Sequence, residues 1–97
     1  KTAYGCAKAA LAALAKGITA DYAAQGIRAN ALLPGGTDTE MMTTDPQQRA
    51  WAEGLHAVKR IARPEEIAAA ILFLASPMSS FVTGAALFAD GGNSAVK

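Results

Sequence analysis

Residues 26–36 read Gly-Ile-Arg-Ala-Asn-Ala-Leu-Leu-Pro-Gly-Gly. Within this stretch, Ile27–Leu33 is short, largely apolar and bounded by glycine and proline, which predicts a buried strand. Nearly continuous apolar runs of this kind are typical of a parallel sheet that is covered on both faces. In open α/β sheets, ligands bind beside the carboxyl ends of the strands. The sequence after Leu33 is therefore the first place to look for a site.

The segment Pro34–Glu40, Pro-Gly-Gly-Thr-Asp-Thr-Glu, has two readings. Its adjacent glycines would let the backbone approach a ligand and expose N–H groups, and its threonines add hydroxyl donors and acceptors. Thr37-x-x-Glu40 also matches a capping box, so the segment could instead be an ordinary turn that leads into a helix. The residues alone leave both readings open.

A long helix is predicted before the strand, over residues 2–25, because apolar residues recur there at helical spacing. These residues are Leu11, Leu14, Ile18 and Tyr22, and alanines at 9, 12, 13, 20, 23 and 24 cover much of the remaining surface. A helix that is apolar nearly all round is buried on more than one side. We expect one face to pack on a sheet and the other on a neighbouring subunit. Burial of the helix within one larger domain is the alternative. Gly26 would end the helix by adopting a positive φ.

A short helix is predicted over residues 46–55, since Asp45 and Pro46 suit the N-cap and the first helical position. Around it, Met41, Met42 and Trp51 could form a flexible lid over an apolar substrate, or could equally be local core. His56, the chain's one histidine, has no carboxylate or serine at a recognisable spacing. It is therefore predicted to be a solvated surface residue.

A third helix begins at Arg63-Pro64-Glu65-Glu66, where proline and two acidic residues suit a first turn, and it ends before Ser76-Pro77. An apolar strand over 85–89 and the turn Asp90-Gly91-Gly92 follow. The order helix, strand, short helix, helix, strand predicts an α/β fold with a parallel strand pair. Two parallel strands need further strands beside them. We therefore expect residues 1–97 to be the C-terminal portion of one larger, doubly wound domain. A start at Lys1 without an initiator methionine agrees with that expectation.

Composition excludes several classes of protein. With 52% hydrophobic and 18% charged residues, the chain is neither disordered nor dominated by charge. Its net charge of +1 gives no reason to expect binding to nucleic acid or to an anionic membrane surface. No apolar run is long enough for a membrane span. The single cysteine, Cys6, excludes an internal disulfide framework and a CxxC metal site, and fits a reducing, cytoplasmic setting.

Near the start of the chain, Tyr4 and Lys8 stand four residues apart in the predicted long helix. Residues at that spacing share one face of a helix, one turn apart. A neighbouring ammonium favours the phenolate form of a tyrosine, so the pair could donate and accept a proton in a reaction. A surface tyrosine beside a solvated lysine is the alternative when this pair is taken alone.

Four segments strengthen the first interpretation. They are Tyr4-x-x-x-Lys8, Ile27-Arg28-Ala29-Asn30-Ala31 followed by Pro34-Gly35, Arg60-x-x-Arg63-Pro64-Glu65-Glu66-Ile67, and Phe81-Val82-Thr83-Gly84 through Asp90-Gly91-Gly92. In this order and spacing they resemble the classical short-chain dehydrogenase/reductase family over nearly the whole chain. The resemblance implies the C-terminal part of a doubly wound, Rossmann-type parallel sheet.

The resemblance also implies a role for each matched residue. Tyr4 would be the general acid/base, and Lys8 would assist it and hydrogen-bond the nicotinamide ribose of NAD or NADP. The loop Pro34, Gly35, Gly36 and Thr37, with the Thr39 hydroxyl, would hold the nicotinamide carboxamide. Residues 38–58, including Met41, Met42 and Trp51, would form the variable substrate lid. No metal is implied.

Beyond the site, the resemblance implies a homotetramer formed through the helix 2–25 and the strand 85–89. The substrate would be a small carbonyl/alcohol pair, such as a 3-oxoacyl thioester or a polyol. Thr37 departs from the family's usual Val or Ile, and Ala62 departs from its usual glycine. The family's glycine-rich phosphate loop and its catalytic serine and asparagine lie upstream of the matched motifs. A non-catalytic binding or assembly subunit is the alternative, and the 97 residues alone are not expected to be active.

Overall fold

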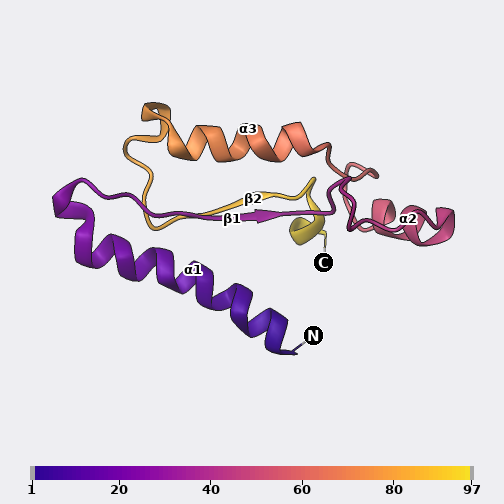
Figure 1. Ribbon diagram of the computed structural model, residues 1–97, viewed down its shortest axis with the longest axis horizontal. Helices are drawn as coiled ribbons and strands as arrows, with labels where there is room; N and C mark the ends of the chain where they lie inside the picture. The colour runs from indigo at the N-terminus through magenta and orange to yellow at the C-terminus, as the bar shows by residue number, and fades with distance from the viewer. Residues whose placement is uncertain (1, 97) are drawn as a thin grey trace. The chain divides into compact units, whose positions relative to one another are not determined.

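Two parallel strands, β1 (Ala31–Pro34) and β2 (Ala86–Ala89), pair to form the sheet in the computed structural model, which describes residues 2–96 (Figure 1). The Ala31 N–H donates to the Ala85 carbonyl at 2.8 Å, and the Gly35 N–H donates to the Ala89 carbonyl at 3.1 Å. The two bonds keep one register from the start of the pair to its end. The predicted α/β class and the parallel pairing are confirmed.

The helices lie where local signals predict them. The long helix α1 (Thr2–Tyr22) runs into a 3₁₀ turn, η1 (Ala23–Gln25), and stops at Gly26, whose φ is 81°. The other helices in chain order are α2 (Pro46–Gly54), α3 (Pro64–Ala75), and the 3₁₀ turns η2 (Pro77–Ser79) and η3 (Asn93–Ala95). Lys1 and Lys97, the ends of the predicted 1–97 domain, lie outside the described residues.

The first strand is shorter than predicted, because regular pairing starts at Ala31 rather than at Ile27. Before Ala31, one backbone bond joins the two chains, from the Gly84 N–H to the Ala29 carbonyl at 2.7 Å, and side chains supply further partners. The Ala29 N–H donates to the Thr83 hydroxyl at 3.2 Å, and the Asn30 amide donates to the Val82 carbonyl at 3.0 Å. The Asn30 side-chain oxygen accepts from the Ala85 N–H at 3.0 Å. The chain before Ala31 is therefore held by side-chain bonds together with this one backbone bond.

The chain folds as two compact units, and the division falls within the strands and α3. Unit 1 contains the residues up to Leu32 together with Phe73–Leu87, and unit 2 contains Leu33–Leu72 and the residues from Phe88 onward. Tyr4 and Lys8 belong to unit 1, whereas the Pro34–Glu40 loop belongs to unit 2.

Arg28 is the central polar contact of unit 1. Its guanidinium donates to the Ser79 hydroxyl at 3.0 Å and to three carbonyls, those of Leu74, Ser76 and Val82, at 3.0–3.2 Å. Ser79 is fully buried and donates in turn to the Leu74 carbonyl at 3.0 Å. The carbonyls at the end of α3 lack partners within the helix, so a cation that bridges them satisfies these acceptors and opposes the negative end of the helix dipole.

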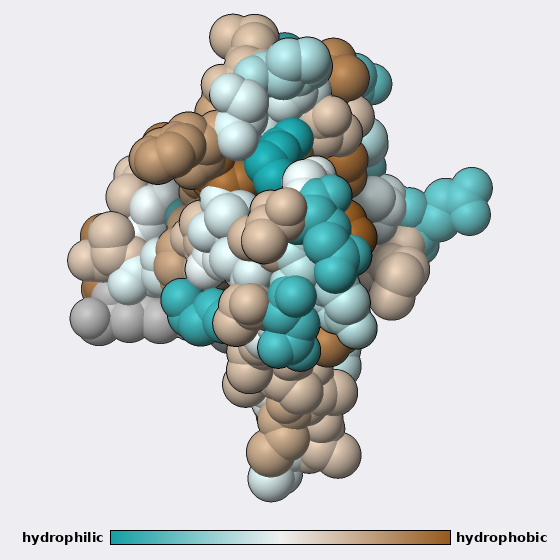
Figure 2. Space-filling model, turned by 90° about the vertical axis from the view of Figure 1, so that its left-hand side faces the viewer, coloured by the Kyte–Doolittle hydropathy of each residue, from teal (hydrophilic) through white to brown (hydrophobic). Residues whose placement is uncertain are grey.

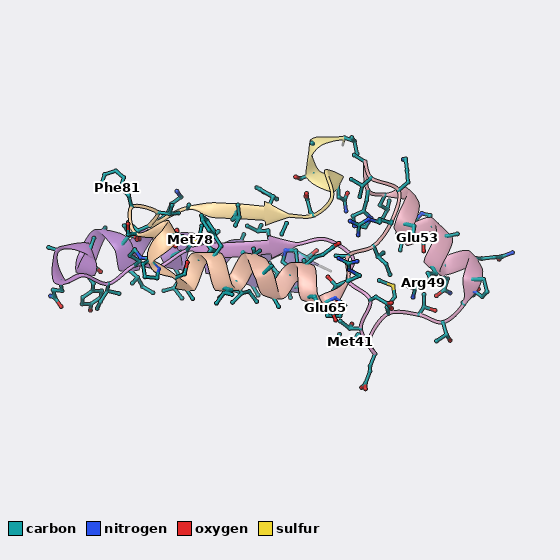
Figure 3. All side chains as sticks on the ribbon, turned by 90° about the horizontal axis from the view of Figure 1, so that it is seen from above. Met41, Arg49, Glu53, Glu65, Met78 and Phe81 are labelled. Atoms are coloured by element: carbon teal, nitrogen blue, oxygen red, sulfur yellow. The ribbon has the colours of Figure 1, made fainter. Side chains whose placement is uncertain are left out.

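Helix α1 joins unit 1 through polar contacts near its end. The Thr19 hydroxyl lies 2.8 Å from the Thr83 hydroxyl, and the Lys16 ammonium donates to the Gly84 carbonyl at 3.1 Å. Among the described residues of α1, only Ala15 is buried, and Leu11 and Leu14 are more than half exposed. Apolar side chains also reach the surface at the turn after α3, where Met78 and Phe81 are exposed (Figure 3). On the face shown in Figure 2, hydrophobic residues in brown lie exposed among hydrophilic residues in teal. The packing of one face of α1 on a sheet and of the other on a neighbouring subunit therefore stays a prediction.

No helix within residues 2–96 combines the length and the apolarity that crossing a membrane requires.

Replacement of Arg28 by lysine tests the Arg28 contact. Lysine keeps the charge but cannot reach the four acceptors with one planar group, so we expect the free energy of unfolding to fall by about 1–3 kcal/mol. Arg63→Lys is the matched control, because the Arg63 side chain is 73% exposed and pairs with Glu66 at 3.3 Å. Chemical denaturation of both variants measures the difference, and equal stabilities would refute the assigned role of Arg28.

Candidate functional site

The predicted catalytic pair lies on one face of α1. The Lys8 Nζ is 5.4 Å from the centroid of the Tyr4 ring, so the ammonium lies over the aromatic face. Cations at this distance are attracted by the ring's electron density. Tyr4 is 70% exposed, which leaves its hydroxyl open to a reacting molecule. The structure thus brings Tyr4 and Lys8 together as their spacing predicts.

Three backbone N–H groups of the Pro34–Glu40 loop of unit 2 have partners within the described residues, those of Gly35, Gly36 and Asp38. The Gly35 N–H donates to the Ala89 carbonyl and the Asp38 N–H donates to the Ala62 carbonyl, at 3.1 and 2.8 Å. The Ala62 N–H donates back to the Gly36 carbonyl at 2.8 Å, which makes Thr37 and Ala62 a parallel bridge. In such a bridge the N–H of Thr37 points away from the partner. Within residues 2–96 it has no acceptor.

His56 is buried, so the prediction that it is a solvated surface residue is wrong. Only 3% of it is exposed. Its Nε2 accepts from the Gly36 N–H at 2.9 Å, and its Nδ1 lies 2.9 Å from the Ala52 carbonyl. The carbonyl can only accept, so Nδ1 carries the proton and the ring is neutral. The prediction failed because Gly36 is twenty residues away, beyond any local spacing rule.

Four glycines pack against the segment that follows α2. A Cβ on Gly35 would lie 2.8 Å from the His56 Nε2, and one on Gly36 would lie 3.1 Å from the His56 ring. A Cβ on Gly91 would lie 2.7 Å from a Val58 methyl group. A Cβ on Gly92 would lie 2.7 Å from the Cβ of Ala57. These glycines therefore allow close packing around His56, which the sequence alone did not predict.

Asp90 holds the turn that carries two of these glycines. Its carboxylate accepts from the Gly92 N–H at 3.0 Å and from the Ser94 N–H at 2.9 Å. These bonds, chiefly the one from Ser94, keep the pKa of Asp90 below its usual 3.8. The Gly91 carbonyl then accepts from the Val58 N–H at 3.1 Å. Asp90 thus stabilises the turn whose Gly91 carbonyl binds the segment containing His56 and Val58.

No helix starts at Thr37, so the capping-box interpretation of Thr37-x-x-Glu40 is wrong. Thr37 instead forms the bridge described above, and its hydroxyl donates to the Gly35 carbonyl at 3.1 Å. Thr39 begins a turn in which its carbonyl accepts from the Met42 N–H at 2.9 Å. The helix cap is at Asp45, which accepts from the Gln47 N–H as the α2 prediction requires.

The segment predicted as a lid presents its large apolar side chains outward. Met41 is 97% exposed (Figure 3). Trp51 is 69% exposed, whereas Met42 is partly buried. Local core is therefore excluded for the first two within the described residues. Arg49, on α2, forms an ion pair with Asp38 in the loop at 3.1 Å. It also lies 3.6 Å from the Glu53 carboxylate, one turn along the same helix. The Arg49 contact lowers the pKa of Asp38.

A cavity of about 320 Å³ opens beside the loop in unit 2. Gly36, His56, Phe88 and Asp90 line it. At its edge the Arg60 guanidinium binds both Glu66 carboxylate oxygens, at 3.0 and 3.1 Å, which lowers the pKa of Glu66. This pairing leaves the edge without a free charge from either residue. No group of side chains suited to a metal ion occurs within residues 2–96.

The Asp90 turn predicts a pH effect on stability. Because the pKa of Asp90 is lower in the folded state, its stabilising effect is full above 3.8 and is lost as the pH falls through the lower, folded-state value. We expect Asp90→Asn to be less stable than the original protein near neutral pH, with the gap closing in acid. Thermal unfolding from pH 7 to pH 2 measures the gap, and a gap that does not change with pH would exclude this role.

Comparisons with known proteins place the chain in a family. The family model described as enoyl-(acyl carrier protein) reductase matches residues 1–94. The chain is 47% identical over 96 residues to cis-4-hydroxycyclohexanecarboxylate dehydrogenase of Sinomonas cyclohexanicum, covering 98% of this chain and 39% of that protein. It thus spans about two fifths of the length of this relative.

Solved structures agree. A short chain dehydrogenase family protein from Francisella tularensis has a TM-score of 0.88 at 33% identity, covering 96% of this chain and 43% of that one. A gluconate 5-dehydrogenase from Burkholderia cenocepacia, in complex with NADP and tartrate, has a TM-score of 0.89 at 37% identity, covering 97% of this chain and 38% of that one. The chain belongs to the short-chain dehydrogenase/reductase family, as its four motifs predict.

Proposed function

We propose that the protein carrying this chain is an NAD(P)-dependent oxidoreductase that interconverts a carbonyl and a secondary alcohol. The observation that carries the proposal is the Tyr4–Lys8 pair, with the ammonium 5.4 Å from the centroid of an exposed phenol ring. The name of the gluconate 5-dehydrogenase and its bound NADP support the reaction class and the type of cofactor.

In the proposed reduction, Tyr4 acts as the general acid. The nicotinamide cofactor supplies the hydride that the carbonyl carbon accepts. The Tyr4 hydroxyl gives its proton to the carbonyl oxygen, which becomes the alcohol, and leaves a phenolate. The Lys8 ammonium stabilises that phenolate through its charge and is proposed to hydrogen-bond the nicotinamide ribose. In the oxidation, the Tyr4 phenolate accepts the proton from the alcohol.

The loop of unit 2 is the proposed binding site for the nicotinamide carboxamide. Its donors fit this group, because the Thr37 N–H has no acceptor among the described residues while the Gly35 and Gly36 N–H groups are already used. A carboxamide oxygen can accept from such an N–H. Pro34 and the glycines set the path of the loop, and the Thr39 hydroxyl is proposed as a further contact. The residues do not distinguish NAD from NADP.

The substrate is proposed to be a small hydroxylated or carbonyl compound that residues 38–58 cover. The exposed Met41 and Trp51, with Met42, would provide an apolar surface for it. The names of the relatives support an alcohol or polyol, and the description of the family model supports an acyl thioester. A fold-retaining, non-catalytic subunit is the alternative, favoured only if the cofactor binds without turnover.

Assembly and location stay predictions. A homotetramer through residues 2–25 and 85–89 would cover Leu11, Leu14 and Phe88, which are each more than half exposed. A cytoplasmic setting rests on the single, exposed Cys6. Neither prediction is needed for the proposed chemistry.

Replacement of Tyr4 by phenylalanine tests the proposed mechanism. Removal of a general acid/base costs about 10²–10⁴-fold in rate, so we expect a loss of kcat in this range for the full-length protein, measured as nicotinamide absorbance with a panel of ketones. Tyr22→Phe removes the same hydroxyl from the same helix and is expected to leave kcat unchanged. Full activity of Tyr4→Phe would disprove the mechanism. Absence of NADH and NADPH binding by the original protein would disprove the function.

A further inference from the structure

His56 joins two parts of unit 2 that the proposed function assigns to different tasks. Its Nδ1–H donates to the carbonyl of Ala52, in the last turn of α2, which belongs to the proposed lid. Its Nε2 accepts from the Gly36 N–H, in the loop proposed to hold the nicotinamide. Both bonds are 2.9 Å long, and only 3% of the residue is exposed.

The bond from the Gly36 N–H to His56 removes one backbone donor of the loop from binding a ligand. An N–H that donates to His56 cannot also donate to a ligand, so Gly36 is excluded as a donor while the contact lasts. The next peptide has the opposite orientation in the bridge to Ala62, and the Thr37 N–H is left without an acceptor within the described residues. The His56 contact thus occupies the Gly36 N–H, while the bridge to Ala62 leaves the Thr37 N–H available to a ligand.

The backbone of nearby glycines lies close to His56 and restricts the position of its ring. The closest approaches at Gly35 and Gly36 are to the ring atoms Nε2 and Cε1, at 2.8 and 3.1 Å from a Cβ built there. On its other side, the Gly91 backbone passes the His56 Cβ, 3.6 Å from where a Cβ of its own would lie. A ring restricted in this way has hydrogen-bonding atoms in a defined position.

We propose that His56 is a positioning residue for the nicotinamide end of the cofactor. It holds the Gly36 N–H so that the Thr37 N–H is presented to the carboxamide, and it keeps the end of α2 in register with that loop. The inference rests on the proposed function, because it assigns the loop to the nicotinamide. His56 itself touches neither the cofactor nor the substrate.

Two substitutions separate the two bonds of His56. Asparagine places an amide nitrogen near the position of Nδ1, so His56→Asn can keep the bond to Ala52 but has no acceptor at Gly36. Glutamine is longer, so His56→Gln can place its amide oxygen near the position of Nε2 and restore that acceptor. Lys59→Met is the matched control, because Lys59 also binds the end of α2, through the Gly54 carbonyl at 3.1 Å, but does not contact the loop.

The test compares two ligands of the full-length protein by calorimetry. One is the reduced dinucleotide that the protein binds, NADH or NADPH, and the other is the matching ADP-ribose, which lacks the nicotinamide. We expect His56→Asn to bind the dinucleotide about tenfold more weakly, since one well-placed hydrogen bond is worth about this much. Binding of the ADP-ribose should not change, His56→Gln should regain most of the affinity, and Lys59→Met should match the original protein.

The outcomes are distinguishable. If the original protein binds no dinucleotide, the proposed function and this inference both fail. If it binds, but His56→Asn leaves the affinity unchanged or weakens both ligands equally, this inference alone fails. Hydrogen exchange on the original protein gives a check that needs no variant. The Gly36 N–H should be protected with or without ligand, and the Thr37 N–H only with the dinucleotide, so equal protection of Thr37 by the ADP-ribose would overturn the proposal.

Discussion

The neutral imidazole of His56 forms the two hydrogen bonds that connect α2 to the loop after β1 in unit 2. It donates to the last turn of α2 through one nitrogen and accepts from the loop after β1 through the other, within 2.9 Å on each side. A buried ring with both nitrogens satisfied fixes two backbone segments at once. The glycines of the Pro34–Glu40 loop and of the Asp90 turn then leave the space that this ring and its neighbours occupy.

Unit 1 is held by a related device. Arg28 satisfies acceptors at the end of α3 and in the chain that follows it, with its partners no more than 3.2 Å away. Both units thus rely on one polar side chain that binds distant backbone, rather than on a large apolar core. Ala15 and Ile61 are the only buried hydrophobic residues within residues 2–96. His56 binds the loop that follows the C-terminal end of β1, and this loop is the proposed nicotinamide site.

The sequence predicts what depends on neighbours in the chain. The stop of α1 at Gly26 follows from the freedom of glycine to take φ of 81°, and the start of α2 follows from the Asp45 cap. The Tyr4–Lys8 contact follows from helical spacing. The late start of β1 and the burial of His56 could not be predicted, because their partners, Thr83 and Gly36, are distant in sequence. Long-range hydrogen bonds leave no periodic signal.

The central claim is that the loop of unit 2 presents the Thr37 N–H to the nicotinamide carboxamide while His56 holds the Gly36 N–H. A crystal structure of the full-length protein with its bound dinucleotide measures this most directly. We predict that the carboxamide oxygen lies within about 3.2 Å of the Thr37 nitrogen while the Gly36 N–H remains on the His56 Nε2. A carboxamide bound to Gly36 with that contact broken, or a nicotinamide away from this loop, would contradict the account.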